Sequence, residues 1–195
     1  NKLLARHTRR VFFVKTERGR DFWVVLDTAA PMDGESHEFE VLFHLAGENA
    51  ARPHADCVAT AFDTGPNLGI YALDTPGLET EVVKGREDPV QGWLPERHGV
   101  PVMYPAPVAL YRQSGDTPRH FGFVLFPGPE GLPPQLGLAP WDAGEDRTGL
   151  EVTLPGGGRY RFAAPVQPHD GSVIGELPAS VVAEKHAGDT WKPLR

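Results

Sequence analysis

Residues 9–45 constrain the fold most strongly, because they hold three strand-like runs with different burial patterns in quick succession. The run at residues 22–27 is continuously apolar and rich in β-branched and aromatic residues, which is typical of a strand covered on both faces. The run at residues 37–45 instead alternates apolar and polar residues, as a strand does when only one face is buried. Together with the first run, at residues 11–15, these patterns predict one β-sheet packed on another.

The rest of the chain continues this pattern of short apolar runs. The 22 glycines and 20 prolines separate the runs instead of gathering in one low-complexity block. No amphipathic helix and no internal repeat are visible, and the runs follow one another at the spacing of an all-β protein. The sequence therefore predicts an antiparallel β-sandwich of about ten strands, formed as a single domain over residues 1–195.

The remaining strands can be placed from composition and turn residues. We expect them at residues 57–63, 68–74, 78–84, 108–112, 120–126, 150–154, 159–163 and 180–184. Turn sequences at residues 64–67 and 155–158 predict two hairpins. Loops are expected at residues 46–56, 85–107 and 127–149, and a C-terminal tail at residues 185–195.

Charge and cysteine content exclude several classes of function. The net charge of −7 provides no basic surface for nucleic acid. No apolar run reaches the roughly 18 residues that a membrane helix needs. A single cysteine, Cys57, excludes an internal disulfide and a cysteine-based zinc cluster, and its place at the start of a strand favours a small core residue over a nucleophile.

The histidines leave a metal site open as an alternative. His37 and His44 lie seven residues apart on one predicted strand, so they point to opposite faces and cannot share a metal ion. A site could still be assembled across strands from His7, Asp27 and His44. The simpler interpretation is that His44 lies on a solvent-exposed face or faces an adjoining domain.

The tryptophans are candidates for stacking on sugar rings. Trp23 lies in the middle of the most apolar run, so we expect it in the core. Trp93 and Trp141 lie in predicted loops, where exposed stacking and anchoring of the loop are both open.

An ordered series of motifs resembles a known family. The segments are His-x-Arg-Arg-Val-Phe-Phe-Val-Lys at residues 7–15, Asp-Phe-Trp-Val-Val-Leu-Asp at 21–27, Phe-His-Leu at 43–45, Val-Val-Lys-Gly at 82–85, and further matches to residue 127. In this order they are similar to the later part of the β-sandwich of heparinase II/III-like polysaccharide lyases. The resemblance covers roughly residues 5–127, which leaves residues 128–195 as additional strands and a tail.

The resemblance implies a bacterial, periplasmic or secreted parent protein that cleaves uronate-containing glycans, such as glycosaminoglycans, by β-elimination. Such lyases pair a helical toroid with the sandwich, and an early sandwich motif, His-x-His-x-Asp-x-Gly-Ser-Phe, supplies a catalytic histidine and usually a structural zinc site. Neither toroid repeats nor this motif occurs here. We therefore expect no catalytic residue and no cofactor in this chain, with the toroid and a polysaccharide as partners and with Arg9, Glu40, His44 and Trp93 as candidate contacts to the substrate.

Two other functional classes remain open. The chain could be a free-standing carbohydrate-binding or interaction module, in which case binding should depend on a loop tryptophan such as Trp93. It could also be a small metal-dependent enzyme that uses the candidate site of His7, Asp27 and His44. Binding measurements and metal analysis of the purified chain distinguish these possibilities.

Overall fold

The fold is entirely β. A computed structural model describes residues 4–16, 20–46, 51–54, 56–95, 99, 102–128, 131–166 and 181–194, and these form 18 strands and no helix. Within these ranges there is consequently no helix that could cross a membrane. The predicted all-β class is confirmed, although the strands are more numerous than the sequence indicates.

The centre of the molecule is an antiparallel sheet of six strands. In spatial order they are β1 (Ala5–Val14), β2 (Phe22–Pro31), β13 (Arg119–Gly128), β6 (Asn67–Ala72), β5 (Cys57–Thr60) and β4 (Ala51–His54). Strand β1 forms one edge of this central sheet, so its outer side has no neighbouring strand among the described residues.

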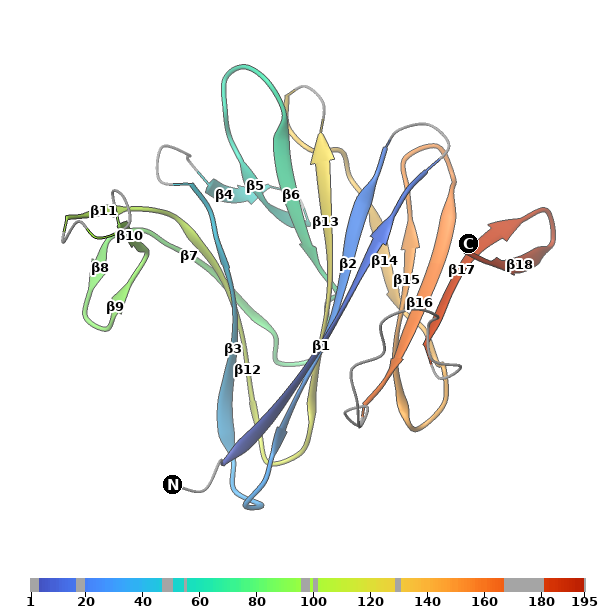
Figure 1. The fold of residues 1–195 in the computed structure, drawn as a ribbon, viewed down its shortest axis with the longest axis horizontal. Helices are drawn as coiled ribbons and strands as arrows, with labels where there is room; N and C mark the ends of the chain where they lie inside the picture. Colours follow the sequence, from blue (N-terminus) through green and yellow to red (C-terminus); the bar gives the residue numbers. More distant parts are fainter. Residues whose placement is uncertain are drawn as a thin grey trace.

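A smaller sheet covers one face of the central sheet and a larger one covers the other (Figure 1). The small sheet consists of β3 (His37–His44), β12 (Val108–Gly115) and β7 (Glu79–Val83). The large sheet consists of β14 (Gly137–Pro140), β15 (Arg147–Thr153), β16 (Arg159–Pro165), β17 (Val182–Ala187) and β18 (Thr190–Pro193). Two short ribbons pair β8 (Arg86–Glu87) with β9 (Val90–Gln91) and β10 (Trp93–Pro95) with β11 (Met103–Pro105).

This layering gives the protein two hydrophobic cores that share the central sheet. Alternate residues of β2 point in opposite directions, so Phe22 and Val24 enter the core against the large sheet while Val25 enters the core against the small sheet. The prediction that this strand is covered on both faces is thus confirmed. In β3, Phe39 and Val41 face the central sheet as the alternating pattern predicts.

Both predicted hairpins are present. Strands β5 and β6 pair across the turn at residues 64–67, and β15 and β16 pair across residues 155–158. In the second turn Gly156 and Gly157 have φ angles of 91° and 87°, which glycine adopts without the strain that a Cβ atom would cause.

The expected loops and the expected tail were partly wrong. The range 46–56 contains β4, the range 85–107 contains the two ribbons, and the range 127–149 contains β14. The C-terminal segment forms β18 and pairs with β17 around Gly188. Short strands next to prolines and glycines escape detection because their pairing is set by neighbouring strands and not by their own composition.

Side-chain stacking explains why the C-terminal segment is ordered. The Arg161 guanidinium lies between two tryptophan rings, 4.5 Å from the centroid of Trp141 and 4.4 Å from that of Trp191. Its Nε also donates a hydrogen bond of 2.5 Å to Glu184 on β17. These contacts attach the last hairpin to the large sheet, and they place Trp141 in a packing role at the end of its loop.

Candidate functional site

A buried carboxylate lies where β1 pairs with β2. Asp27 is 0% exposed and accepts two hydrogen bonds from Arg9, from Nε at 2.8 Å and from Nη2 at 2.7 Å. Its Oδ1 also lies 3.1 Å from Nε2 of His7. Arg9 and Asp27 are directly opposite in the antiparallel register, so the pairing of the two strands brings the charges together.

The geometry of this pair fixes the charge and direction of Arg9. The hydrogen bonds to Asp27 raise the pKa of Arg9 above its ordinary value, so the guanidinium remains a cation. The bidentate contact uses one side of the planar group. Because the Arg9 side chain is still 41% exposed, its remaining N–H groups can reach a ligand from solvent.

The cluster forms one wall of a cleft of about 390 Å³ between the central sheet and β3. Glu40 and Leu42 line its rim from β3, and their side chains lie on the outer face of that strand, whereas Phe39 and Val41 face the central sheet. The cleft thus brings together two of the predicted substrate-contacting residues, Arg9 and Glu40, which the sequence separates by the whole of β2 and the two connections that flank it. It combines hydrogen-bond donors and acceptors with an apolar floor, an arrangement suited to a polar ligand.

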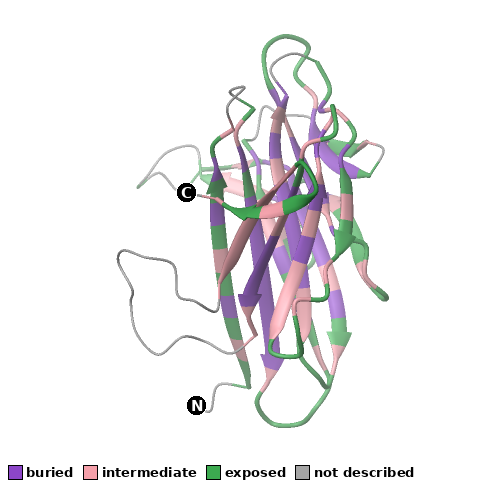
Figure 2. Cartoon of the chain, turned by 90° about the vertical axis from the view of Figure 1, so that its right-hand side faces the viewer, coloured by how far each residue is buried: buried purple, intermediate pink, exposed green. Residues whose placement is uncertain are grey.

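An exposed apolar strip continues from this cleft along the edge of the central sheet. It consists of Val11, Phe13 and Trp23, whose residues are 59%, 50% and 37% exposed. The Phe13 and Trp23 rings stack with centroids 4.9 Å apart. Figure 2 shows the alternation of exposed and buried residues along the edge strand β1.

The expectation that Trp23 lies in the core was wrong. Trp23 is on the face of β2 that the small sheet covers, but the small sheet does not extend over the β1 edge at this end. Its partner across the strands, Phe13, is exposed for the same reason. The apolar strip is therefore a feature that the sequence alone did not reveal.

The other two candidate contact residues lie elsewhere. His44 is exposed at the end of β3 and does not line the cleft. Trp93 is half-buried, and its Nε1 donates a hydrogen bond of 2.9 Å to the Arg86 carbonyl oxygen. That hydrogen bond joins the two ribbons, so Trp93 anchors its loop. A role of His44 or of Trp93 in substrate binding stays a prediction.

The described residues contain no group of three or more histidine, cysteine, aspartate or glutamate side chains arranged to hold a metal ion. Of the candidate metal ligands, His7 and Asp27 are adjacent, but their contact is part of the cluster with Arg9. The side chain of His44 is on the face of β3 opposite to Phe43, which packs toward the central sheet.

Cys57 has the environment of a core residue. It is buried at the start of β5, and its Sγ donates a hydrogen bond of 3.2 Å to the His54 carbonyl oxygen. Burial raises the pKa of the Cys57 thiol to about 11, whereas a nucleophilic cysteine needs a lowered pKa.

The Cys57 environment predicts slow alkylation. At pH 8 we expect iodoacetamide to modify the folded chain at least about ten-fold more slowly than the urea-unfolded chain, since the folded state contains less thiolate. Because the folded-state pKa is raised, stability from the neutral thiol is complete below the unfolded-state pKa and is lost as the pH rises toward 11. Equal alkylation rates in the two states would contradict the buried position.

Comparisons with known proteins give one similar fold among the solved structures. No family model matches the sequence, and a search of curated proteins finds no match. Among solved structures, the chain is similar to a heparinase III, the BT4657 gene product, solved with methylated lysines. The TM-score is 0.57 at 15% sequence identity, over 84% of this chain and 24% of that chain. The chain therefore has a heparinase-like fold at low sequence identity, and it spans about a quarter of the length of that protein.

Proposed function

We propose that this chain is the non-catalytic β-sandwich domain of a heparinase II/III-like polysaccharide lyase, and that it supports the cleft in which the parent enzyme cleaves an acidic glycan. The parent reaction is β-elimination at a uronate, in which a base removes the C5 proton and an acid assists departure of the 4-O-linked sugar. In this proposal a helical toroid supplies those groups, and the sandwich supplies a rigid wall.

The observation that carries the proposal is the apolar strip of Val11, Phe13 and Trp23 beside the Arg9–Asp27 cluster. Large apolar side chains that gather on one surface mark a place where another body packs. The strip lies on the rigid central sheet, next to a cleft with a fixed cation. A toroid packed on the strip would leave the Arg9 cleft at the boundary of the two domains, where ligand sites are common.

Arg9 and Glu40 are the residues that we propose for contact with the glycan. Arg9 presents a positive charge whose position is set by Asp27, and it can bind a uronate carboxylate or a sulfate. Glu40 lies at the rim of the cleft, on the outer face of β3, where it can accept hydrogen bonds from sugar hydroxyl groups. Glu40 in turn receives a hydrogen bond of 2.7 Å from Arg112, which holds it at the rim.

The direct test is a lyase assay on the isolated, folded chain. Heparin, heparan sulfate, alginate and hyaluronan are each incubated with the chain, and the unsaturated uronate product is followed by its ultraviolet absorbance. We expect no turnover with any of the four, alongside a commercial lyase as positive control. A rise in absorbance that depends on the chain and disappears after heat denaturation would show that the catalytic groups are present and would overturn the proposal.

The stacked pair of Phe13 and Trp23 also supports a second candidate, a free-standing carbohydrate-binding module. Exposed aromatic rings bind the apolar faces of sugars. In that case the isolated chain should bind a neutral oligosaccharide on a glycan array, and Trp23→Ala should abolish the signal. The proposed domain of a lyase instead predicts no binding of neutral glycans by this pair.

A further inference from the structure

The outer edge of β1 has no neighbouring strand in the described part of the chain. β1 is ten residues long and pairs with β2 on its other side only. An edge strand presents a row of N–H and C=O groups that can pair with another extended chain. The direction of those groups along β1 therefore decides what the edge can bind.

A hydrogen bond at the start of β1 fixes which backbone groups point outward. The Leu4 carbonyl oxygen accepts a bond of 2.8 Å from the Met32 N–H, in the register that the β1–β2 ladder continues. In an antiparallel ladder, residues whose groups bond to the partner strand alternate with residues whose groups point away from it. The pairing is one to one along all of β1. The residues with outward groups are therefore Ala5, His7, Arg9, Val11 and Phe13.

The outward backbone groups and the exposed side chains belong to the same residues of β1. Val11 and Phe13 are 59% and 50% exposed, whereas Phe12 and Val14 are buried in the core against the large sheet. A strand added to β1 would lie in the plane of the central sheet, beside the apolar strip. Apolar side chains on one face of that strand would extend the strip.

The other edges of the three larger sheets carry features that oppose strand pairing. The edge strands β4, β14 and β18 each contain a proline, which cannot donate a hydrogen bond to a ladder. The edge strands β3 and β7 carry exposed glutamates. β1 contains no proline and exposes two large apolar side chains. Of these six edges, β1 is the one best suited to accept a strand with apolar residues.

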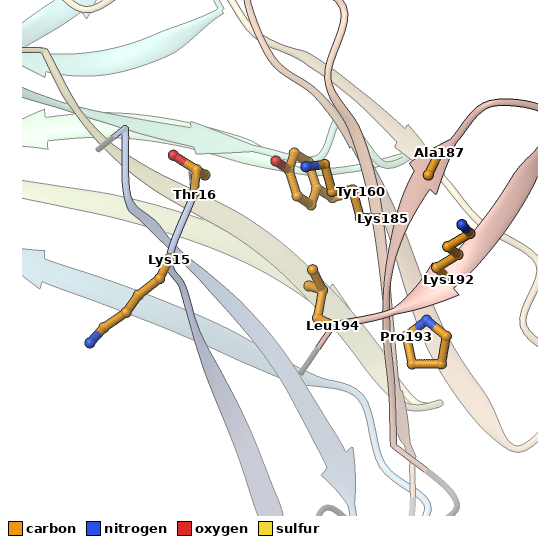
Figure 3. Close-up of a pocket in the computed structure, with 8 residues that line it drawn as sticks. All are labelled: Lys15, Thr16, Tyr160, Lys185, Ala187, Lys192, Pro193 and Leu194. Atoms are coloured by element: carbon orange, nitrogen blue, oxygen red, sulfur yellow. The ribbon is translucent and has the colours of Figure 1, made fainter. Parts of the chain in front are cut away.

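The charges along β1 select the kind of strand that can pair there. Residues 4–16 contain four arginine and lysine residues and no aspartate or glutamate, in a chain whose net charge is −7. Asp27 neutralises Arg9, but Arg10 contacts the Arg9 carbonyl oxygen, which supplies no counter-charge. Lys15 follows β1 and points away from the large sheet (Figure 3). The edge therefore favours an acidic partner.

A second copy of this chain is a poor partner for the edge. Two β1 strands related by a two-fold axis can form a ladder only where outward residues face outward residues. The two registers of this kind with the longest overlap are centred on Arg9 and on Arg10, and each places an arginine directly opposite itself. Like charges at opposed positions destabilise a sheet. The cations thus discourage self-association and leave pairing with an acidic segment open.

We propose that the outer edge of β1 binds an extended acidic segment of another polypeptide, which joins the central sheet as a seventh strand. In that segment apolar residues alternate with glutamate or aspartate. The apolar side chains lie beside Val11 and Phe13, and the acidic side chains lie on the opposite face, beside Arg10. Backbone hydrogen bonds supply the affinity, and the charges supply the choice of partner.

Anisotropy titration of a labelled peptide with the full chain tests the charge preference. The probe is a short synthetic peptide of alternating glutamate and valine, and its matched control has lysine in place of each glutamate. We expect the basic peptide to bind at least about ten-fold more weakly than the acidic one. Arg10→Glu should weaken binding of the acidic peptide at least about five-fold, because it places like charges opposite each other.

A proline substitution tests the backbone contact. Val11→Pro removes an outward N–H group and leaves the hydrogen bonds between β1 and β2 in place. We expect it to weaken binding of the acidic peptide at least about ten-fold. Val11→Ala is the matched control, because it loses the side chain and keeps the N–H group, and it should weaken binding less than about three-fold. Thermal unfolding of both variants shows whether the fold is retained.

Hydrogen exchange in the parent chain gives a readout that needs no substitution. In the free chain the outward amides of β1 should exchange faster than the alternate amides, which bond to β2. Saturation with the acidic peptide should slow exchange of the outward amides at least about ten-fold. Exchange of the outward amides that is unchanged by bound peptide would show that the peptide packs elsewhere and would overturn the proposal.

Three further outcomes overturn the proposal. The first is absence of binding by the acidic peptide, and the second is equal binding of the acidic and basic peptides. The third is a dimer in sedimentation experiments that Val11→Pro abolishes, because a second copy would then occupy the edge. The proposal goes beyond the proposed function, since peptide binding requires neither a glycan nor turnover. The lyase assay therefore tests the proposed function alone.

Discussion

Replacing Phe22 with alanine is expected to lower the free energy of unfolding by about 3–5 kcal/mol. Phe22 is 0% exposed and lies between the central and large sheets, with ring centroids 5.4 Å from Tyr160 and 6.4 Å from Phe162. Its removal leaves a cavity that rigid strands on both sides cannot close, so both transfer and cavity costs apply. Urea unfolding followed by circular dichroism measures the change from the transition midpoint and slope.

Phe13→Ala is the matched control for this substitution. Phe13 is the same residue type on the neighbouring strand, but it belongs to the exposed apolar strip. Its loss should cost less than about 1 kcal/mol, mainly through the stacking on Trp23. Equal costs for the two substitutions would mean that the β1 edge is covered and that the strip is part of a core.

Replacing Arg9 with alanine is expected to cost about 2–3 kcal/mol, less than a fully buried ion pair because Arg9 is partly exposed. The substitution removes two hydrogen bonds from Asp27, which has no access to solvent of its own. A buried carboxylate that loses its cation retains the full cost of its desolvation. The same urea experiment measures this effect.

A double-mutant cycle shows whether the loss of stability in Arg9→Ala comes from its contact with Asp27. Asp27→Asn should cost less in the Arg9→Ala background than in the parent chain, with a coupling of about 1–3 kcal/mol. Arg10→Ala, one residue along the strand, is the control and should change stability by less than about 0.5 kcal/mol. Additive effects of the two cluster substitutions would contradict the direct contact between Arg9 and Asp27.

The local sequence predicts those parts of the fold that depend on burial pattern and turn chemistry. The apolar run of β2 indicates cover on both faces, and the structure places Phe22 and Val25 in different cores. The glycine turn at residues 155–158 likewise predicts the hairpin of β15 and β16. In each case the deciding information lies within a few consecutive residues.

Parts of the fold that depend on contacts between residues far apart in the chain cannot be predicted from the local sequence. Trp23 has the sequence context of a core residue, and its exposure depends on how far the small sheet extends across the central sheet. The sequence predicts a tail at residues 185–195, yet the contacts of Arg161 with the Trp141 and Trp191 rings attach this segment to the large sheet. Contacts of that kind join residues far apart in the chain.

The candidate site likewise depends on contacts between residues that are far apart in the sequence. The sequence predicts Arg9 and Glu40 in one set of candidate contact residues, but the cleft that both residues line depends on the position of β3 beside the central sheet. The last predicted strand, at residues 180–184, is present as β17 (Val182–Ala187), although its bounds differ by a few residues.

The central claim, that this chain is one domain of a larger heparinase-like lyase, is tested most directly by the mass of the native polypeptide that carries the sequence. An antibody raised against the folded domain can isolate that polypeptide from its source, and mass spectrometry then gives its intact mass and its other peptides. We predict a polypeptide several times heavier than the 21.3 kDa of this chain, with further peptides from amphipathic helices of a toroid. A native polypeptide of 21.3 kDa, with no peptides beyond this sequence, would contradict the claim.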